Sequence, residues 1–181
     1  AHDGKVDVPE TVDTGDMVLR AEVEIDPEET AGELSERLSR MGPGLMLEAL
    51  DLIESGKARP VPQQGEPTGA PRLKKEDGRI PFHKDAAAVV DLIRGVTPWP
   101  GAFAFIDGRR VTVHRARLLE RSGRDGRPGE VLEVTPEGIV VAAGEGRVLL
   151  TELQMEGKAR MPAVDFWRGI KAGERPAFTA E

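Results

Sequence analysis

The sequence contains no cysteine and no tyrosine, and it has only two tryptophans and five phenylalanines among its 181 residues. Without cysteine, the chain has no disulfide, no thiolate metal ligand and no cysteine nucleophile. The three histidines, His2, His83 and His114, are too far apart in the sequence for two of them to share one helical face, and we therefore predict no metal site.

Long apolar runs are also missing. None approaches the roughly 18 residues that a membrane-spanning helix needs. The first thirty residues are acidic and lack the basic and then apolar order of a signal peptide. We therefore expect a soluble cytoplasmic protein that is not exported and has no membrane partner.

Acidic residues outnumber basic residues over the whole chain, but the two kinds are unevenly distributed along it. The formal net charge is −7, yet residues 72–129 carry 13 Lys and Arg against 7 Asp and Glu, whereas residues 1–69 carry 6 against 16. A basic segment attracts nucleic-acid phosphates through counterion release whatever charge the rest of the protein carries. The asymmetry indicates a half that faces a polyanion, although a solvated, arginine-rich protein surface would have the same composition.

The first part of the chain predicts a strand followed by a helix. Residues 17–25, MVLRAEVEI, alternate as in a strand. Thr30 and Glu33 have the spacing of a capping box, and apolar residues then recur every three or four positions until Gly56, a plausible helix stop. The Gly-Pro-Gly triplet at 42–44 interrupts this helix, either as a kink or as a helix–turn–helix break.

The second part predicts a small barrel. Residues 58–71, rich in proline and glycine, are typical of an extended linker. Asp85 is placed to cap a short helix that ends at Gly95. Five strands with hairpin spacing follow at 102–107, 109–118, 129–134, 138–143 and 147–155, and a last helix is expected at 163–173. This pattern is typical of a small closed or partly open barrel.

Three stretches resemble the C-terminal half of the methionyl-tRNA formyltransferase family: VDTGDMVLRAEVEI (12–25), APRLKKEDGRI (70–80) and LIRGVTPWPGAFAFIDGRRV (92–111). With the matching order of elements, the likeness extends from about residue 11 over nearly the whole chain. The resemblance implies an α+β chain in three parts. Residues 1–57 would be a strand-plus-helix remnant of a Rossmann-like formyltransferase domain, 58–72 a proline-rich linker, and 73–181 an OB-like barrel that helps to hold tRNA.

The resemblance also implies a reaction. Members of this family transfer the formyl group of 10-formyltetrahydrofolate to the methionyl amino group of initiator tRNA, using an Asn, a His and an Asp. Only the Asp matches a residue here, Asp13, and the Ser-Leu-His-x-Ser-Leu-Leu-Pro motif of the other two is absent from the sequence. Because formyl transfer needs an oxyanion donor as well as a base, we expect this chain alone to be incomplete and to need a separate catalytic part. Asp13 could equally form an Asx-type turn.

With the family in view, the basic residues become candidate RNA ligands: Lys74, Lys75, Arg79, Arg94, Arg109, Arg110, Arg115 and Arg117. Simple strand alternation puts Arg109, Arg115 and Arg117 on one face and Arg110 on the other. RNA helices are held largely by backbone contacts, for which arginine and lysine suffice.

The scarce aromatic residues point away from base stacking, because Trp99 and Phe103 are expected to anchor the core of the barrel. Two other functions stay open on the sequence. One is an RNA-binding module without catalysis, and the other is part of a folate-dependent sugar-amine formyltransferase. The basic linker and the TPWPGA stretch favour the tRNA enzyme over the sugar enzyme.

Overall fold

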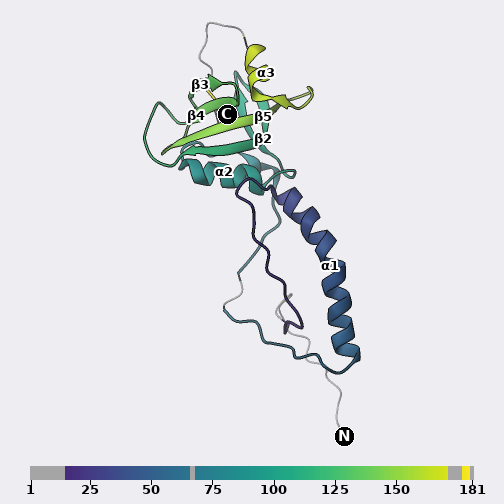
Figure 1. The fold of residues 1–181 in the computed structure, drawn as a ribbon. Coiled ribbons are helices and arrows are strands. Elements are labelled where there is room, and N and C mark those ends of the chain that lie inside the picture. Colours follow the sequence, from purple (N-terminus) through teal and green to yellow (C-terminus); the bar gives the residue numbers. More distant parts are fainter. Residues whose placement is uncertain (1–14, 66–67, 171–176, 180–181) are drawn as a thin grey trace. The chain divides into compact units, whose positions relative to one another are not determined.

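The computed structural model describes residues 15–65, 68–170 and 177–179 (Figure 1). Its elements are α1 (Ala31–Glu54), the 3-10 helix η1 (Lys75–Gly78), α2 (Ala86–Gly95), β1 (Ala102–Ile106), β2 (Arg109–Glu120), β3 (Val131–Thr135), β4 (Gly138–Ala142), β5 (Arg147–Met155), β6 (Met161–Pro162) and α3 (Ala163–Arg168). The chain divides into two compact units. One combines Ala1–Glu24 with Glu36–Arg72, and the other combines Ile25–Ser35 with Leu73–Glu181.

The second unit is built on an antiparallel sheet with the order β1-β2-β5-β4-β3, and β6 pairs with Glu152 and Leu153 of β5, beyond the residues that pair with β4. The five predicted strands are confirmed, with ends that shift by no more than two residues. The predicted hairpin between β1 and β2 also forms. Asp107 and Gly108 both have positive φ, 49° and 69°, as a tight two-residue turn requires.

The sheet does not close through its own edge strands, so the predicted OB-like barrel is not confirmed. The short segment 177–179 instead bridges the two edges, with Thr179 opposite Phe105 of β1 and Ala177 opposite Glu130, just before β3. Phe178, 1% exposed, lies between these bridges. The structure therefore shows an α+β fold in which an antiparallel sheet is combined with helices.

The core lies between the inner face of the sheet and α2. Val113, Ile139 and Leu150 are fully buried on the sheet side, and Val89 of α2 faces them. Asp85 caps α2 as predicted, because its carboxylate Oδ1 accepts a hydrogen bond from the Ala88 backbone N–H at 2.8 Å. This cap fixes where α2 begins on the sheet.

Of the two aromatic residues predicted to anchor the core, only one is buried. Phe103 is buried as expected, at 6% exposure, but Trp99 is 53% exposed, so its assignment to the core is wrong. Trp99 lies in the turn between α2 and β1. The last helix, α3, ends at Arg168 with Gly169 as its C-cap, so its predicted end at residue 173 is wrong. In this helix Phe166 is buried and Trp167 packs partly against the core.

The strand predicted at 17–25 does not form. A single bridge joins Met17 to Val61, through backbone N–H to O distances of 2.9 Å in both directions. A strand needs a neighbouring strand for its hydrogen bonds, and the described residues of this unit supply only Val61. Of the strand and the helix predicted for residues 1–57, only the helix forms among the described residues.

The helix α1 runs unbroken from Ala31 to Glu54 with Pro43 inside it, so the helix–turn–helix alternative is wrong. It ends as predicted, because Gly56 takes φ +66° and the N–H of Lys57 donates to the carbonyl of Leu52 at 2.9 Å. None of its residues is buried. Six of its large apolar side chains are 42–64% exposed: Leu38, Met41, Met46, Leu47, Leu50 and Ile53.

In the part of the chain that the structure describes, no helix is both long enough and apolar enough to span a membrane.

Candidate nucleic-acid interface

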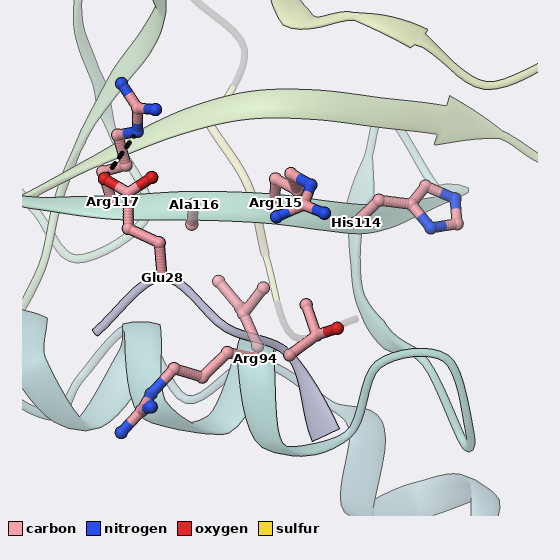
Figure 2. A pocket seen from close by; sticks show the side chains of 8 residues that line it. Glu28, Arg94, His114, Arg115, Ala116 and Arg117 are labelled. Atoms are coloured by element: carbon pink, nitrogen blue, oxygen red, sulfur yellow. Dashed lines mark ion pairs between the residues drawn. The ribbon is translucent and has the colours of Figure 1, made fainter. Parts of the chain in front are cut away.

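Residues 25–35, which we call the strap, belong to the second unit and lie between β2 and α2 (Figure 2). The backbone N–H of Gly32 donates to the carbonyl of Thr97 at 3.0 Å. A Cβ atom at Gly32 would lie only 2.6 Å from Cδ of Pro98. Glycine is therefore required for this close approach, which attaches the first turn of α1 to the turn after α2.

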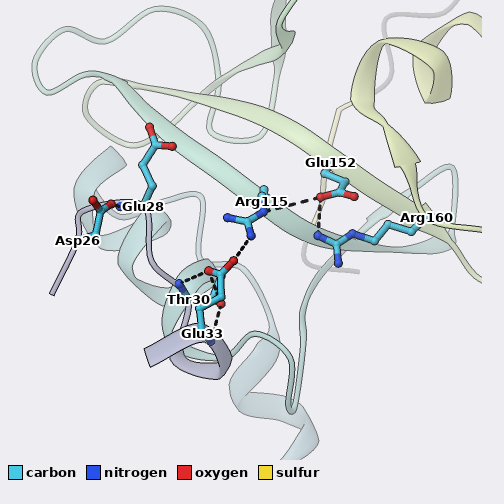
Figure 3. Close-up of polar contacts among 7 residues, drawn as sticks. All are labelled: Asp26, Glu28, Thr30, Glu33, Arg115, Glu152 and Arg160. Carbon is cyan, nitrogen blue, oxygen red and sulfur yellow. Dashed lines mark hydrogen bonds and ion pairs between the residues drawn. The ribbon is translucent and has the colours of Figure 1, made fainter. Parts of the chain in front are cut away.

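The predicted capping box at the start of α1 is confirmed (Figure 3). The Thr30 backbone N–H and hydroxyl donate to Glu33 Oε2 at 2.9 and 2.8 Å, and the Glu33 N–H donates to the Thr30 hydroxyl at 3.3 Å. Arg115 donates to the other carboxylate oxygen, Oε1. The backbone and hydroxyl bonds from Thr30, followed by the bond from Arg115, lower the pKa of Glu33 from 4.5 to about 2.

This depressed pKa predicts a specific loss of stability in acid. Because the pKa of Glu33 is about 2 in the folded protein and 4.5 in the unfolded chain, its carboxylate stabilises the fold fully above pH 4.5. This stabilisation is lost as the pH falls towards about 2. Between pH 5 and 2, wild type is expected to lose about 1 kcal/mol more unfolding free energy than Glu33→Gln, since solvent screens a half-exposed carboxylate. Urea unfolding at several pH values measures this. Equal losses in the two proteins would contradict the assignment.

Two arginines of β2 face carboxylates of the strap. Arg117 pairs with Glu28 at 3.0 Å, from Nε to Oε1, and Arg115 pairs with Glu33. Figure 2 shows Glu28 reaching from the strap to Arg117. Arg115 also lies 4.0 Å from Glu152 of β5. The two arginines are therefore engaged by carboxylates of their own chain.

The predicted grouping of the arginines by face is wrong, because β2 is irregular. Its pairing with β5 shifts register on both sides of Arg115. Val111 and Val113 are buried before this point, whereas Ala116 and Leu118 pack against the core after it. A bulge of this kind reverses the alternation of faces. Arg115 and Arg117 therefore share the outer face with Arg110, and Arg109 does not.

A second basic group lies around the β1–β2 hairpin and η1. The Arg110 guanidinium lies 3.9 Å from the centroid of the Phe103 ring, in cation–π geometry. The helix η1 packs on β1 beside it. A Cβ atom at Gly78 would lie 2.1 Å from the Gly101 carbonyl oxygen and 3.4 Å from the ring of Phe103, so the two segments are in close contact. Arg79 follows, with its backbone in a parallel bridge to Phe103.

We call Lys74, Lys75, Arg109 and Arg110 the hairpin cluster. Lys74, Lys75 and Arg109 are exposed and form no ion pair with any residue that the structure describes. The exposed residues Glu76 and Asp77 directly follow the two lysines, and Asp77 accepts a hydrogen bond from the Lys74 backbone N–H at 2.6 Å. The side chains of Lys74, Lys75 and Arg109 are therefore accessible to a ligand from solvent.

A pocket of about 290 Å³ lies between the strap, α2 and β2 (Figure 2). Arg94 and His114 line it together with Arg115 and Arg117. Arg94 donates to Asp91 at 2.9 Å, and His114 Nε2 lies 2.9 Å from Gln154 Oε1. These four side chains therefore each have a polar partner within the protein.

The remaining candidates are placed as follows. Asp13, the predicted catalytic residue, lies outside the described residues, so its role stays a prediction. Among the described residues, no group of three or more His, Asp or Glu side chains could hold a metal ion. The strap carboxylates were not identified from the sequence as partners of the arginines, because Glu33 is recognisable there only as a capping residue and Glu28 carries no motif.

The fold of this chain is similar to that of several solved structures. HypX from Aquifex aeolicus in complex with tetrahydrofolic acid matches 93% of this chain and 32% of its own, with a TM-score of 0.62 and 24% identity. The N-formyltransferase from Helicobacter canadensis in complex with folinic acid and dTDP-3-aminofucose matches 82% of this chain and 53% of its own, with a TM-score of 0.60 and 16% identity. At these identities the likeness establishes the fold alone.

The family model described as "Formyl transferase, C-terminal domain" matches residues 72–171, and the chain belongs to this family. Methionyl-tRNA formyltransferase from Pelotomaculum thermopropionicum is 42% identical over 165 residues, 91% of this chain and 53% of the relative. The enzyme of the same name from Koribacter versatilis is 45% identical over 162 residues, 88% of this chain and 51% of the relative. The resemblance to the C-terminal part of that enzyme is confirmed. The chain spans about half the length of these curated relatives.

Proposed function

We propose that this chain is the tRNA-engaging C-terminal part of a methionyl-tRNA formyltransferase. The observation that carries the proposal is the 42–45% identity to enzymes of that name over about nine tenths of the chain. The acceptor is then initiator methionyl-tRNA, the formyl donor is 10-formyltetrahydrofolate, and the reaction takes place in the cytoplasm. The sugar-modifying N-formyltransferase shares the fold at only 16% identity, which gives the sugar-amine reading no support beyond the fold.

Catalysis requires a part that this sequence does not contain. The Asn and His of the family's formyl-transfer centre have no counterpart here, and Asp13 is proposed as the third member of that centre. The relatives are about twice as long as the matched region, which supports a further catalytic part on the same or a separate chain. The exposed apolar side chains of α1, among them Met46 and Leu47, would pack against that part and become buried.

We also propose that the chain consists of three parts. Residues 1–57 are assigned to the end of the formyltransferase domain, 58–72 to the linker and 73–181 to the tRNA-binding domain, in which the bridges of segment 177–179 would complete an OB-like barrel. The basic region 72–129 lies mostly in this last domain and supplies the charge for phosphate contacts.

Fluorescence anisotropy with labelled initiator tRNA tests the binding role. We expect binding that weakens steeply between 50 and 200 mM salt, by about threefold for each phosphate contact. Lys57→Ala/Lys158→Ala/Arg168→Ala serves as a control that removes three positive charges outside residues 72–129 and should leave the salt dependence unchanged. Absence of binding at low salt would overturn the proposed role.

A formyl-transfer assay tests the catalytic part of the proposal. The chain alone is expected to transfer no formyl group from 10-formyltetrahydrofolate to methionyl-tRNA, because it lacks an oxyanion donor. Addition of the separately produced N-terminal half of one of the relatives is expected to restore transfer. Transfer by the chain alone would show that its own residues suffice.

A further inference from the structure

The eight basic residues predicted to bind RNA do not have equivalent surroundings. Arg115 and Arg117 each face a carboxylate of the strap, whereas Lys74, Lys75 and Arg109 form no ion pair with the residues that the structure describes. An arginine that already bonds a carboxylate must release it before it can bond a phosphate. The strap and an RNA phosphate would therefore compete for Arg115 and Arg117.

We propose that Glu28 and Glu33 occupy Arg117 and Arg115 in place of RNA phosphates, so that the hairpin cluster, and not these two arginines, contacts the RNA backbone. The inference rests on the proposed tRNA-binding function and specifies which surface of the second unit carries it. The strap then acts as an intramolecular competitor that masks part of the positive surface of β2.

Glu33 is a strong competitor because three interactions besides Arg115 hold its position. Its Oε2 accepts from both donors of Thr30, and its own N–H donates back to the Thr30 hydroxyl. Thr30 is itself only 6% exposed, so the capping box does not rotate freely. Loss of the Arg115 contact would leave the carboxylate in place beside the guanidinium. The low pKa of Glu33, about 2, means that this carboxylate stays charged at neutral pH.

The strap as a whole is tethered, which raises the effective concentration of both carboxylates. Gly32 binds the Thr97 carbonyl and packs on Pro98, only one residue from Glu33. Glu28 lies on the other side of Thr30, and its backbone N–H donates to the Asp26 carboxylate at 2.8 Å. Tethered groups compete as if present at roughly millimolar concentration or more, well above typical RNA concentrations.

The hairpin cluster has the opposite properties. Its members come from two segments held together by the contact of Gly78 with the Gly101 carbonyl. Arg110 is placed over the Phe103 ring, which orients its guanidinium without neutralising its charge. Lys74, Lys75 and Arg109 are exposed, so each of them carries its positive charge in solvent. Phosphate contacts at exposed lysines and arginines are the usual source of sequence-independent RNA affinity.

Salt-series anisotropy with initiator tRNA separates the two groups through four proteins. These are wild type, the strap variant Glu28→Gln/Glu33→Gln, the arginine variant Arg115→Gln/Arg117→Gln, and the cluster variant Lys74→Ala/Lys75→Ala/Arg109→Ala. Glu48→Gln/Glu54→Gln on exposed positions of α1 is a control with the same net-charge change as the strap variant. Thermal unfolding by circular dichroism verifies that each variant is folded under the assay conditions.

The expected results differ in sign. The strap variant should bind more tightly than its control, with a slope of log affinity against log salt that is steeper by about 0.7–0.9 for each arginine released. The cluster variant should weaken binding and flatten the slope by about 2–3. The arginine variant should leave the slope unchanged, because its side chains make no phosphate contact in the wild type.

Other outcomes would overturn the inference. A flatter slope in the arginine variant would show that Arg115 and Arg117 bind phosphate despite the strap. A strap variant that matches its control would show that no masking exists. If wild type fails to bind but the strap variant binds, the masking stands and the proposed function falls; if neither binds, both fall.

Discussion

Replacing Leu150 by alanine is expected to lower the free energy of unfolding by about 2–5 kcal/mol. Leu150 is fully buried in β5, which has β2 on one side and β4 on the other, where it pairs with Ala116 and Ile139. The shorter side chain leaves a cavity that these regular strands cannot easily collapse to fill. Urea unfolding followed by circular dichroism measures the change.

Leu119→Ala provides the matched control. Leu119 lies in β2 of the same sheet but is 52% exposed, so its truncation is expected to change stability by no more than about 0.5 kcal/mol. Similar losses in the two variants would contradict the placement of the core on the side of the sheet that α2 covers.

The second large effect is expected at Gly32, where alanine should destabilise the second unit by about 1–3 kcal/mol. A Cβ atom there would lie 2.6 Å from Cδ of Pro98, a ring that cannot rotate away, so the strap or the turn after α2 must shift. The shift would weaken the bond from Gly32 to the Thr97 carbonyl and displace Glu33 from Arg115. Thermal unfolding measures the loss.

Gly42→Ala in the same helix should have the opposite sign. Nothing lies within 4 Å of a Cβ atom at Gly42, and alanine is favoured over glycine inside a helix by up to about 1 kcal/mol. A stabilised Gly32→Ala protein would mean that the close contact with Pro98 is absent in solution, and that helix propensity alone governs both positions.

The elements predicted correctly from the sequence are those with short-range signals. The cap of α2 at Asp85, the Thr30 capping box and the Asp107-Gly108 hairpin each depend on residues within four positions of one another, and all three form. Such motifs satisfy backbone groups locally, so their residue types are sufficient to recognise them.

The errors come from features that depend on a distant partner. The residues 17–25 alternate like a strand, but the described part of the unit has no second strand to pair with them. Trp99 resembles a core residue by type, yet its turn holds it 53% exposed. The bulge at Arg115 arises from the match between β2 and β5, and simple alternation cannot reveal it.

The sequence by itself determined the family, the order of the strands along the chain and the ends of α1 and α2, because these are encoded in local motifs and spacing. Only the tertiary structure decided which basic residues stay available to a polyanion. Glu33 and Arg115 are 82 residues apart in the sequence and meet because the strap folds back onto β2. A charge is neutralised by what lies near it in space, and the fold alone sets that neighbourhood.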